Sequence, residues 1–573
     1  MIIERRPSLP VSEELASAFG PVLGQILADR GFASSSEVSN ELSQLLSFHQ
    51  LAGLPEALAL LQQGLEQGWH LCLVGDFDVD GATSVVLGLE ALRAMGAARV
   101  SYAVPNRFDY GYGLTPALVD AIAPSQPQLL ITVDNGIAAQ EGVAHAQALD
   151  MKVLVTDHHL PGESLPTADA IVNPNQPGCG FAAKNSSGCT VLFYLLSALR
   201  AHLQQTGWFA SRALPVPVMA DYLDLVALAT VADVVPLDAN NRILVAQGLK
   251  RMRAGRLRPG LAALLQVAKR PLAHLRASDL GFALGPRINA AGRLDDITLG
   301  IECLLCGDPN LALQMAEELD AINQERRQIE TEMQERADDI LRALQFGDQP
   351  DAAIVVYDPA WHQGVIGLLA SRLKERWYRP VIALAPGGDG ILKGSARSIP
   401  GLHLRDALDL LSKRYPGLFI KFGGHAMAAG MSLHESQLPR LKQALPELVA
   451  ELLTPDQLRQ QLWHDGELPL ALISAEFALQ LQRLGPWGQH CPEPVFFGRF
   501  QLQQQRLLKG KHLKMMLSQQ GMYLDAIAFN VNPQDWPNPL CKEVELVYRL
   551  DINHYQGESR LQLMVEHLRP VME

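Results

Sequence analysis

Short, uniformly apolar runs alternate with segments of helical periodicity between residues 70 and 175. The apolar runs are LCLVGD, RVSYAVP, QLLITVD, MKVLVTD and ADAIVNP, and the segments between them include ATSVVLGLEALRAMG and AQEGVAHAQALD. Such runs are typical of strands that are buried on both faces, as in a parallel sheet covered by helices. The pattern therefore predicts an α/β domain built on a parallel sheet.

The rest of the chain predicts a long helix and two further domains. Helix formers continue from 308 to about 345 without Pro or Gly beyond the first turn, and at 1.5 Å per residue that helix would be ~60 Å long. A second α/β pattern follows in AAIVVYD, GVIGLLASRLKERW and PVIALAP, and alternating segments after 460, such as FGRFQLQQQRLL and EVELVYRLDINHY, predict a small β-barrel. The predicted boundaries are 1–45 for an N-terminal segment, 46–305 for a catalytic domain with a helical extension, 306–346 for the connecting helix, 347–455 for the second α/β domain and 460–573 for the barrel.

Composition is that of an ordinary globular protein. The chain has 573 residues, of which 48% are hydrophobic and 19% are charged. No apolar stretch approaches the ~20 residues needed to cross a bilayer, and the first residues lack the apolar region of a signal peptide, so we expect no membrane association and a cytoplasmic location. The seven cysteines are scattered, and we interpret Cys303 and Cys306 as core residues rather than as half of a zinc site.

The charge is unevenly distributed. A formal net charge of −13 argues weakly against a nucleic-acid partner. Two windows nevertheless contain cations and no acids, one between Asp238 and Asp279 and one between Glu493 and Asp525. Their cations are Arg242, Lys250, Arg251, Arg253, Arg256, Arg258, Lys269, Arg270 and Arg276 in the first, and Arg499, Arg506, Lys509, Lys511 and Lys514 in the second. Either window is a solvated face or part of a path for a nucleic acid.

The stretch GDFDVDGATS places three aspartates at alternate positions. It matches the start of an EF-hand calcium loop, which requires a preceding helix and a Glu at loop position twelve. Position twelve counted from Asp76 is Leu87, and the preceding HLCLVG is typical of a buried strand. The sequence therefore excludes the EF-hand.

Acids and histidines recur at the ends of the predicted strands. Ligands of parallel sheets bind at the carboxyl ends of strands, where these side chains would meet. They are Asp76, Asp78, Asp80, Asp134, Asp157, His158 and His159, joined by Asp233 at the end of a predicted helix. Each acid alone could be a helix cap or a turn residue. Together they favour Mn²⁺, with Mg²⁺ as the alternative, and suffice for two ions ~3.5–4 Å apart that hydrolyse a phosphoester.

Eight motifs in order resemble one family. DFDVDG, VDNGI, TDHH and ATVADVVPL resemble the motifs of the DHH phosphoesterase superfamily, and GPRINAAGRLDD, WHQGVIGLLASRL, GSARS and FGGHAMAAG are similar to those of its RecJ family. The resemblance implies a single-stranded-DNA-specific 5′→3′ exonuclease that releases 5′-mononucleotides in DNA recombination and repair. It also implies that the barrel is an OB-fold.

The resemblance implies roles for individual residues. The metal ligands and catalytic residues would be Asp78, Asp80, Asp134, His158, His159 and Asp233, with Asp134 as a bridging ligand and with Asp76 and Asp157 at or just behind the metals. A pocket for the 5′-phosphate would comprise Arg107, Arg287, Ser395 and Arg397, with Asn289 and Arg293 as weaker candidates, and the glycine-rich loop Gly423, Gly424 and His425 would approach a phosphate. The segment after Arg107 reads FDYGYGL, where the family pattern is an acid followed directly by GYGL.

The expected partners also follow from the resemblance. They are single-stranded DNA with a 5′ end, single-stranded-DNA-binding protein and a RecQ-type helicase, and we expect a monomer. Aromatic residues of the barrel could stack on bases or form its core: Phe496, Phe497, Phe500 and Tyr523.

Two alternative functions remain. A different DHH hydrolase, acting on pyrophosphate, cyclic dinucleotides or very short RNA, would share the metal motifs but would not need the barrel. A non-catalytic scaffold, like the replicative-helicase subunit of the superfamily, would be expected to lose metal ligands, and every candidate is present here.

Overall fold

The computed structural model describes residues 2–105, 113–343, 351–555 and 558–571. Arg107 and positions 344–346 of the predicted connecting helix lie outside the described residues. The chain divides into two compact units. The large unit comprises Glu4–Gly292, Asp296–Leu319 and Trp463–Glu573, and the small unit comprises Met1–Ile3, Arg293–Asp295 and Asp320–Leu462. The predicted domain boundaries stay predictions.

The large unit contains the predicted parallel sheet, with strand order β3-β2-β4-β5-β6. The strands are β2 (His70–Val74), β3 (Arg99–Ala103), β4 (Leu129–Val133), β5 (Lys152–Thr156) and β6 (Ala170–Val172). Leu71 and Leu73 of β2 pack into one apolar cluster, and Cys72 and Val74 pack into another on the opposite face. Because successive side chains point to opposite faces of a strand, both faces of the sheet are buried.

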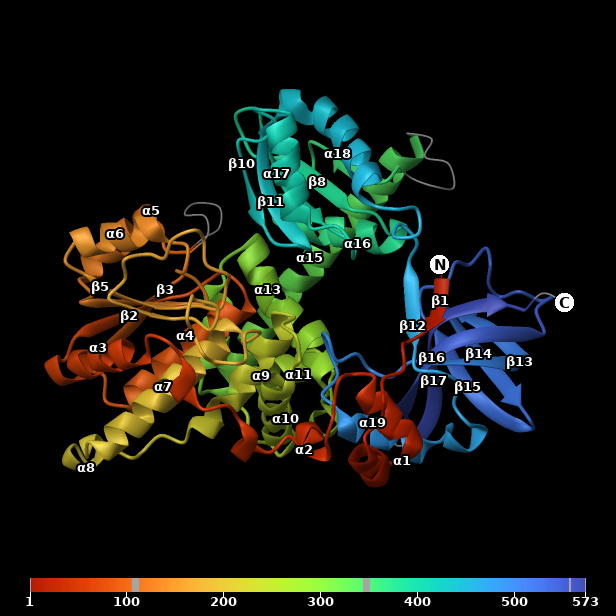
Figure 1. Cartoon of the computed structure of the whole chain (residues 1–573), viewed down its shortest axis with the longest axis horizontal. Coiled ribbons are helices and arrows are strands. Elements are labelled where there is room, and N and C mark those ends of the chain that lie inside the picture. Colours follow the sequence, from red (N-terminus) through yellow and green to blue (C-terminus); the bar gives the residue numbers. More distant parts are fainter. Residues whose placement is uncertain (1, 106–112, 344–350, 556–557, 572–573) are drawn as a thin grey trace. The chain divides into compact units, whose positions relative to one another are not determined.

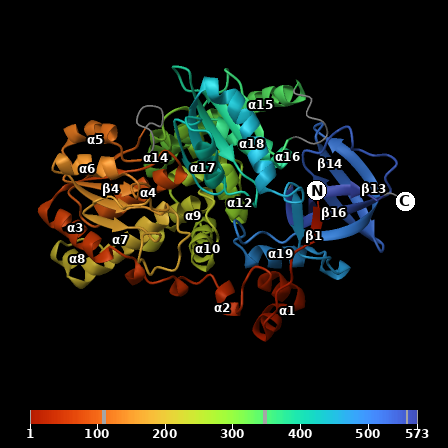
Figure 2. The ribbon, with the colours of Figure 1, turned by 45° about the horizontal axis from the view of Figure 1, so that its top comes forward.

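Helices cover both faces of this sheet, as Figures 1 and 2 show for α5 and α6 on one side and α3 and α7 on the other. The helices around the sheet are α3 (Leu54–Gln67), α4 (Val79–Ala94), α5 (Pro116–Ile122), α6 (Gln140–Ala148) and α7 (Gly188–Gln205). The helical extension adds α9 (Leu223–Ala232), α10 (Ala239–Arg253), α11 (Pro259–Val267), α13 (Gly285–Leu294) and α14 (Thr298–Leu305). The predicted α/β architecture is confirmed.

The C-terminal barrel is closed, with strand order β13-β14-β15-β17-β16. Its strands are β13 (Phe496–Leu508), β14 (His512–Gln519), β15 (Met522–Ala528), β16 (Glu543–Tyr555) and β17 (Glu558–Pro570). Its apolar core includes residues of α1 (Glu13–Ala28) and α19 (Ala475–Leu484).

The barrel aromatics separate into two groups. Phe496 and Phe500 are each only 1% exposed and belong to the core, so the interpretation of these two as base-stacking residues is wrong. Phe497 is half-buried, and Tyr523 is 68% exposed. Tyr523 is therefore the most exposed of the four aromatic residues.

A buried arginine joins the barrel region to the helical extension. Arg242 of α10 is 1% exposed and donates to the carbonyl oxygens of Leu484 and Pro486 at 2.7 and 2.6 Å. Its Nη1 also lies 3.3 Å from Sγ of Cys491. Arg242, which the sequence placed in a cationic window, is therefore an internal anchor rather than part of a solvated face.

The small unit is a second α/β fold with strand order β10-β11-β9-β8-β7. Its strands are β7 (Ile354–Tyr357), β8 (Val381–Pro386), β9 (Ile391–Arg397), β10 (Lys421–Gly424) and β11 (Ala428–His434). Its helices are α16 (Ile366–Trp377), α17 (Leu404–Arg414) and α18 (Leu438–Leu452). The predicted long helix is α15 (Pro309–Ala343), of which residues up to Leu319 belong to the large unit.

No helix among the described residues is both long and apolar enough to cross a membrane. Cys303 is fully buried, as its interpretation as a core residue requires, whereas Cys306 is half-buried.

Candidate metal centre

The acids singled out in the sequence lie where the parallel strands end. Asp134 directly follows β4, and Asp157 directly follows β5. Asp76 lies two residues beyond β2, and Asp233 follows the last residue of α9. Neighbouring parallel strands end at the same edge of a sheet, which brings Asp76, Asp134 and Asp157 together, and the end of α9 adds Asp233.

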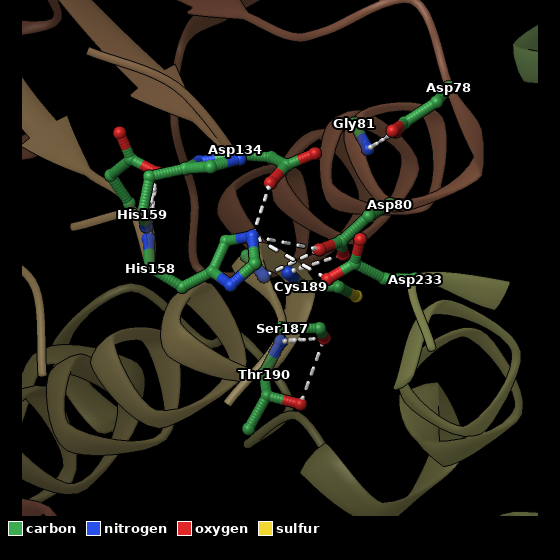
Figure 3. A network of polar contacts seen from close by, with 12 residues as sticks. Asp78, Asp80, Gly81, Asp134, His158, His159, Ser187, Cys189, Thr190 and Asp233 are labelled. Atoms are coloured by element: carbon green, nitrogen blue, oxygen red, sulfur yellow. Dashed lines mark hydrogen bonds and ion pairs between the residues drawn. The ribbon is translucent and has the colours of Figure 1, made fainter. Parts of the chain in front are cut away.

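The imidazole of His158 stands among three carboxylates (Figure 3). Its Nε2 lies 3.1 Å from Oδ1 of Asp134, 3.8 Å from Oδ2 of Asp80 and 3.6 Å from Oδ2 of Asp233. The side chains of Asp80 and Asp134 are nearly inaccessible to solvent, whereas that of Asp233 is 25% exposed. One edge of the centre is therefore open to solvent.

Asp157 orients the second histidine. Its Oδ1 lies 2.8 Å from Nδ1 of His159 and accepts the backbone N–H groups of His158 and His159 at 2.7 and 3.1 Å. Its Oδ2 accepts the N–H of Ile137 at 2.9 Å. A ring nitrogen held by a carboxylate is the usual arrangement of a ligating histidine, whose other ring nitrogen binds the metal.

The N-terminus of α7 holds Asp80. The backbone N–H groups of Gly188 and Cys189 donate to the two oxygens of Asp80 at 2.6 and 2.8 Å. A Cβ atom on Gly188 would lie 2.6 Å from Cβ of Asp134, so only glycine allows this approach. The sequence analysis missed both residues, although the stretch SSGCT before an apolar run is a recognisable helix start.

Asp78 is the N-cap of α4. Its Oδ1 accepts the N–H of Gly81 at 3.0 Å. One oxygen of this acid therefore acts as a helix cap, as the alternative interpretation of the sequence allowed. Gly81 itself lies against the backbone of Asp76, because a Cβ there would be 2.5 Å from the Asp76 nitrogen. The DFDVDG loop is therefore folded tightly onto the start of its own helix.

Three carboxyl groups of the cluster have raised pKa values. Burial, and then the charge of Asp78, raise the pKa of Asp80 to about 7. Burial and the neighbouring carboxylates, Asp80 foremost, raise the pKa values of Asp134 and Asp233 well above the ordinary value. For His159, burial alone would lower the pKa, but the hydrogen bond and charge of Asp157 outweigh it and raise the pKa to about 9. The same pairing holds the pKa of Asp157 below its usual value, although burial opposes this.

The donor set fits divalent cations. Three groups have ligand atoms within 4.8 Å of one another: Asp134 with His158 and His159, Asp80 with His158 and Asp233, and Asp76 with Asp78 and Asp134. Buried carboxylates repel one another unless a cation neutralises them, as their raised pKa values indicate. Carboxylate oxygen and imidazole nitrogen without thiolate are the ligands of Mn²⁺ and Mg²⁺ rather than of structural zinc.

Five of the residues predicted to contact phosphate lie on β9, on β10 or directly after β10 in the small unit. Nη1 of Arg397 donates to Oγ of Ser395 at 3.1 Å. Gly423 pairs with Gly430 of β11, which pairs with Ser395 of β9, so Gly423 and Ser395 lie at the same level of the sheet. Gly424 follows on β10, and the backbone N–H of exposed His425 donates to Ala428 at 2.8 Å.

The environment of Arg397 favours an anion. Burial lowers the pKa of its guanidinium, and no carboxylate of the described residues forms an ion pair with it. A Cβ on Gly367 of α16 would lie 3.1 Å from both Nη2 of Arg397 and Oγ of Ser395, so this glycine keeps the space beside them free. Gly367 was not singled out in the sequence, where it is one glycine within a helical pattern.

The remaining three candidates lie on α13. Arg287 is buried and donates to the carbonyl of Ala283 at 2.6 Å. Oδ1 of Asn289 accepts the N–H of Val79 at 3.0 Å, within the DFDVDG loop. Nη1 of Arg293 lies 3.4 Å from the carbonyl of Gly364, and both residues belong to the small unit.

Comparison with known proteins identifies the family. The chain matches the DHH family, N-terminal domain, over residues 70–230, the DHHA1 domain over 351–451 and the RecJ OB domain over 464–567. It is 51% identical over 572 residues to the single-stranded-DNA-specific exonuclease RecJ of Dickeya dadantii, which covers 99% of each chain. The chain belongs to the RecJ family. The resemblance seen in the sequence is thereby confirmed.

Solved structures of the family share the fold. RecJ from Thermus thermophilus in complex with Mn²⁺ is 31% identical, with a TM-score of 0.80, and the match covers all of this chain and 80% of that one. RecJ from the same organism in complex with Mg²⁺ is 29% identical, with a TM-score of 0.75, and the match covers all of this chain and 79% of that one. The closed barrel of this chain thus corresponds to the OB domain of the family.

Proposed function

We propose that this chain is a metal-dependent exonuclease that degrades single-stranded DNA from the 5′ end and releases 5′-mononucleotides, in DNA recombination and repair. The observation that carries the proposal is the convergence of buried carboxylates and two imidazoles at the carboxyl edge of the sheet, in a chain of the RecJ family. The family membership argues against the short-substrate DHH hydrolases, and the complete donor set argues against a non-catalytic scaffold.

The proposed metal ligands are Asp78, Asp80, Asp134, His158, His159 and Asp233, and the proposed metals are two Mn²⁺ ions with Mg²⁺ as the alternative. Two such ions, when bound, lower the pKa of water and neutralise charge on a phosphodiester. Asp134 belongs to two of the three donor groups, which supports its assignment as a bridging ligand. Asp76, which shares a donor group with Asp78 and Asp134, stays a further candidate.

The chain's own residues prepare this centre. Asp157 fixes the ring of His159, and the α7 N–H groups fix both oxygens of Asp80. A positioned carboxylate costs no reorganisation when the charged substrate arrives, which is the main advantage of a preorganised site. We therefore assign Asp157 to orienting a ligand rather than to binding metal.

The proposed contacts with the 5′-phosphate involve Arg397 and Ser395 of β9, which is separated by β11 from the strand of Gly423 and Gly424. Arginine suits phosphate because its planar fork makes two parallel hydrogen bonds with phosphate oxygens. His425 and Arg287 remain candidates for the same role, as does Arg107.

The proposed setting is the cytoplasm, where the enzyme would act as a monomer with single-stranded-DNA-binding protein and a RecQ-type helicase. The two protein partners are those expected of the family. Sedimentation of the purified protein and co-purification with each partner test these expectations, and a stable dimer or the absence of either complex would contradict the corresponding expectation.

The deciding experiment is digestion of a single-stranded oligonucleotide that is labelled at one end or the other, with Mn²⁺, Mg²⁺ or a chelator. Mononucleotides should leave the 5′ end, only with metal, and the Asp134→Ala variant should be inactive. The exposed carboxylate variant Glu141→Gln is the matched control and should keep full activity. Intact DNA with the wild-type protein would refute the exonuclease, and undiminished activity of Asp134→Ala would refute the metal assignment.

A further inference from the structure

Helix α13 packs against the loop that carries Asp76, Asp78 and Asp80. Oδ1 of Asn289 accepts the backbone N–H of Val79 at 3.0 Å, although the two residues are 210 positions apart in the chain. Val79 is the first residue of α4, and the first N–H groups of a helix have no partner within it. A side chain from another helix therefore supplies the acceptor that this N–H needs.

A second contact of α13 lies one turn further along the same helix. A Cβ atom on Gly292 would lie 2.0 Å from the carbonyl oxygen of Phe77, so the backbone of α13 touches the loop there. Residues three apart on a helix share a face, which places Asn289 and Gly292 on the face of α13 that meets the loop. Phe77 and Val79, the two residues contacted, alternate with the three aspartates.

These contacts fix the loop at its non-acidic positions. Within the loop, Gly81 donates to Asp78 and packs on Asp76, and the N–H of Phe77 donates to Oδ1 of Asp76 at 2.8 Å. With Val79 also hydrogen-bonded to Asn289 and Phe77 against Gly292, a shift of the peptides that flank Asp78 would break these contacts.

We propose that Asn289 is a positioning residue for the metal centre, acting through the N–H of Val79, and not a ligand of the DNA 5′-phosphate. The inference rests on the proposed function, because it assumes that the loop with Asp76, Asp78 and Asp80 binds Mn²⁺. It differs from the expectation drawn from the sequence, which grouped Asn289 with Arg287 as a phosphate contact. A positioning role predicts weakened metal binding even when no DNA is present.

The test is titration of Mn²⁺ into the full-length, DNA-free protein by calorimetry, for three variants. Asn289→Leu has nearly the same volume and no acceptor, and its Mn²⁺ affinity should fall about tenfold or more, as for other groups that support a ligand. Asn289→Asp keeps an acceptor for Val79 and should bind Mn²⁺ at least as tightly as the wild type. If Asn289→Leu does not fold, Asn289→Ala removes the acceptor with a smaller side chain and should show the same loss.

The outcomes separate the inference from the proposed function. Wild-type Mn²⁺ affinity in Asn289→Leu or Asn289→Ala would overturn the positioning role. A raised KM for 5′-phosphorylated DNA in the same variant would make Asn289 a phosphate contact. Equal losses in Asn289→Asp and Asn289→Leu would overturn the role of the Val79 acceptor. A wild-type protein that binds no Mn²⁺ would refute the metal centre itself, and the inference with it.

Discussion

The backbone N–H of Gly188 donates a hydrogen bond to Oδ2 of Asp80 at 2.6 Å, and the same glycine lies against Asp134. One residue at the start of α7 thus touches two acids, one in the first turn of α4 and one directly after β4. Since a helix N-terminus carries partial positive charge, it offsets part of the repulsion among these carboxylates. The approach is possible only because position 188 has no side chain.

We expect Gly188→Ala to damage the metal centre. Its Cβ would lie 2.6 Å from Cβ of Asp134, so either α7 or Asp134 must move. Mn²⁺ affinity should fall about tenfold or more, measured by titration calorimetry. Gly307→Ala is the matched control, because a Cβ there meets nothing within 4 Å. Unchanged Mn²⁺ binding by Gly188→Ala would contradict the geometry described for Asp134.

Metal-free protein should lose stability as the pH rises from 6 to 9. A group whose pKa is raised on folding stabilises the folded protein fully at pH values below its unfolded-state pKa. That stabilisation is lost as the pH rises through its folded-state pKa. For Asp80 this stabilisation is lost between pH 3.8 and about pH 7, and for His159 it is lost between pH 6.5 and about pH 9. Both groups therefore make the folded protein less stable as the pH rises. Because cations compete with protons, Mn²⁺ should raise the Tm more at pH 8 than at pH 6. Thermal melts with Mn²⁺ or chelator test this, and an equal Tm increase at both values would count against it.

Arg397→Gln should remove the preference for a 5′-phosphate. The variant loses a charge-assisted contact of about 1.5–3 kcal/mol, so KM for 5′-phosphorylated DNA should rise at least tenfold. KM for DNA with a 5′-hydroxyl should change little. Exposed Arg405→Gln, in the same unit, is the control for general charge loss. An equal rise of KM for both DNA ends would show that Arg397 does not read the terminal phosphate.

Two barrel aromatics should respond differently to truncation. Phe500 is 1% exposed, and Phe500→Ala should lower the free energy of unfolding by about 3–5 kcal/mol, as for other buried aromatics. Tyr523 is 68% exposed, and Tyr523→Ala should leave stability unchanged while weakening single-stranded DNA binding by about 1 kcal/mol or more. Denaturant unfolding and fluorescence anisotropy measure the two effects. Full DNA affinity in Tyr523→Ala would exclude stacking at this position.

Arg242→Met should destabilise the junction between α10 and the barrel region. The substitution leaves the buried carbonyl groups of Leu484 and Pro486 without their donor, which costs about 2 kcal/mol or more in total. Exposed Arg256→Met, from the same cationic window, should change stability by less than about 0.5 kcal/mol. Thermal denaturation compares the two, and equal Tm values would show that the buried contacts of Arg242 contribute nothing net.

The layers of the fold and the convergence of the acids follow from local patterns in the chain. Uniformly apolar runs separated by helical segments can bury themselves only as a parallel sheet with helices on both faces. In such a sheet, residues that follow neighbouring strands must meet at one edge, so the pattern alone predicts that Asp134 and Asp157 are neighbours. The long helix and the barrel followed from equally local patterns of periodicity.

How those acids are held, and which side chains face inward, depends on long-range packing. The contacts of Asn289 with Val79 and of Gly188 with Asp80 join segments more than 100 residues apart, and no local pattern encodes which distant helix supplies a given partner. Burial of Arg242 and of Phe500 likewise depends on what packs over them, because an arginine or an aromatic at a given position fits either a surface or a core. Local physics therefore sets the elements and the chemistry they carry, while long-range packing sets the precise environment of each functional group.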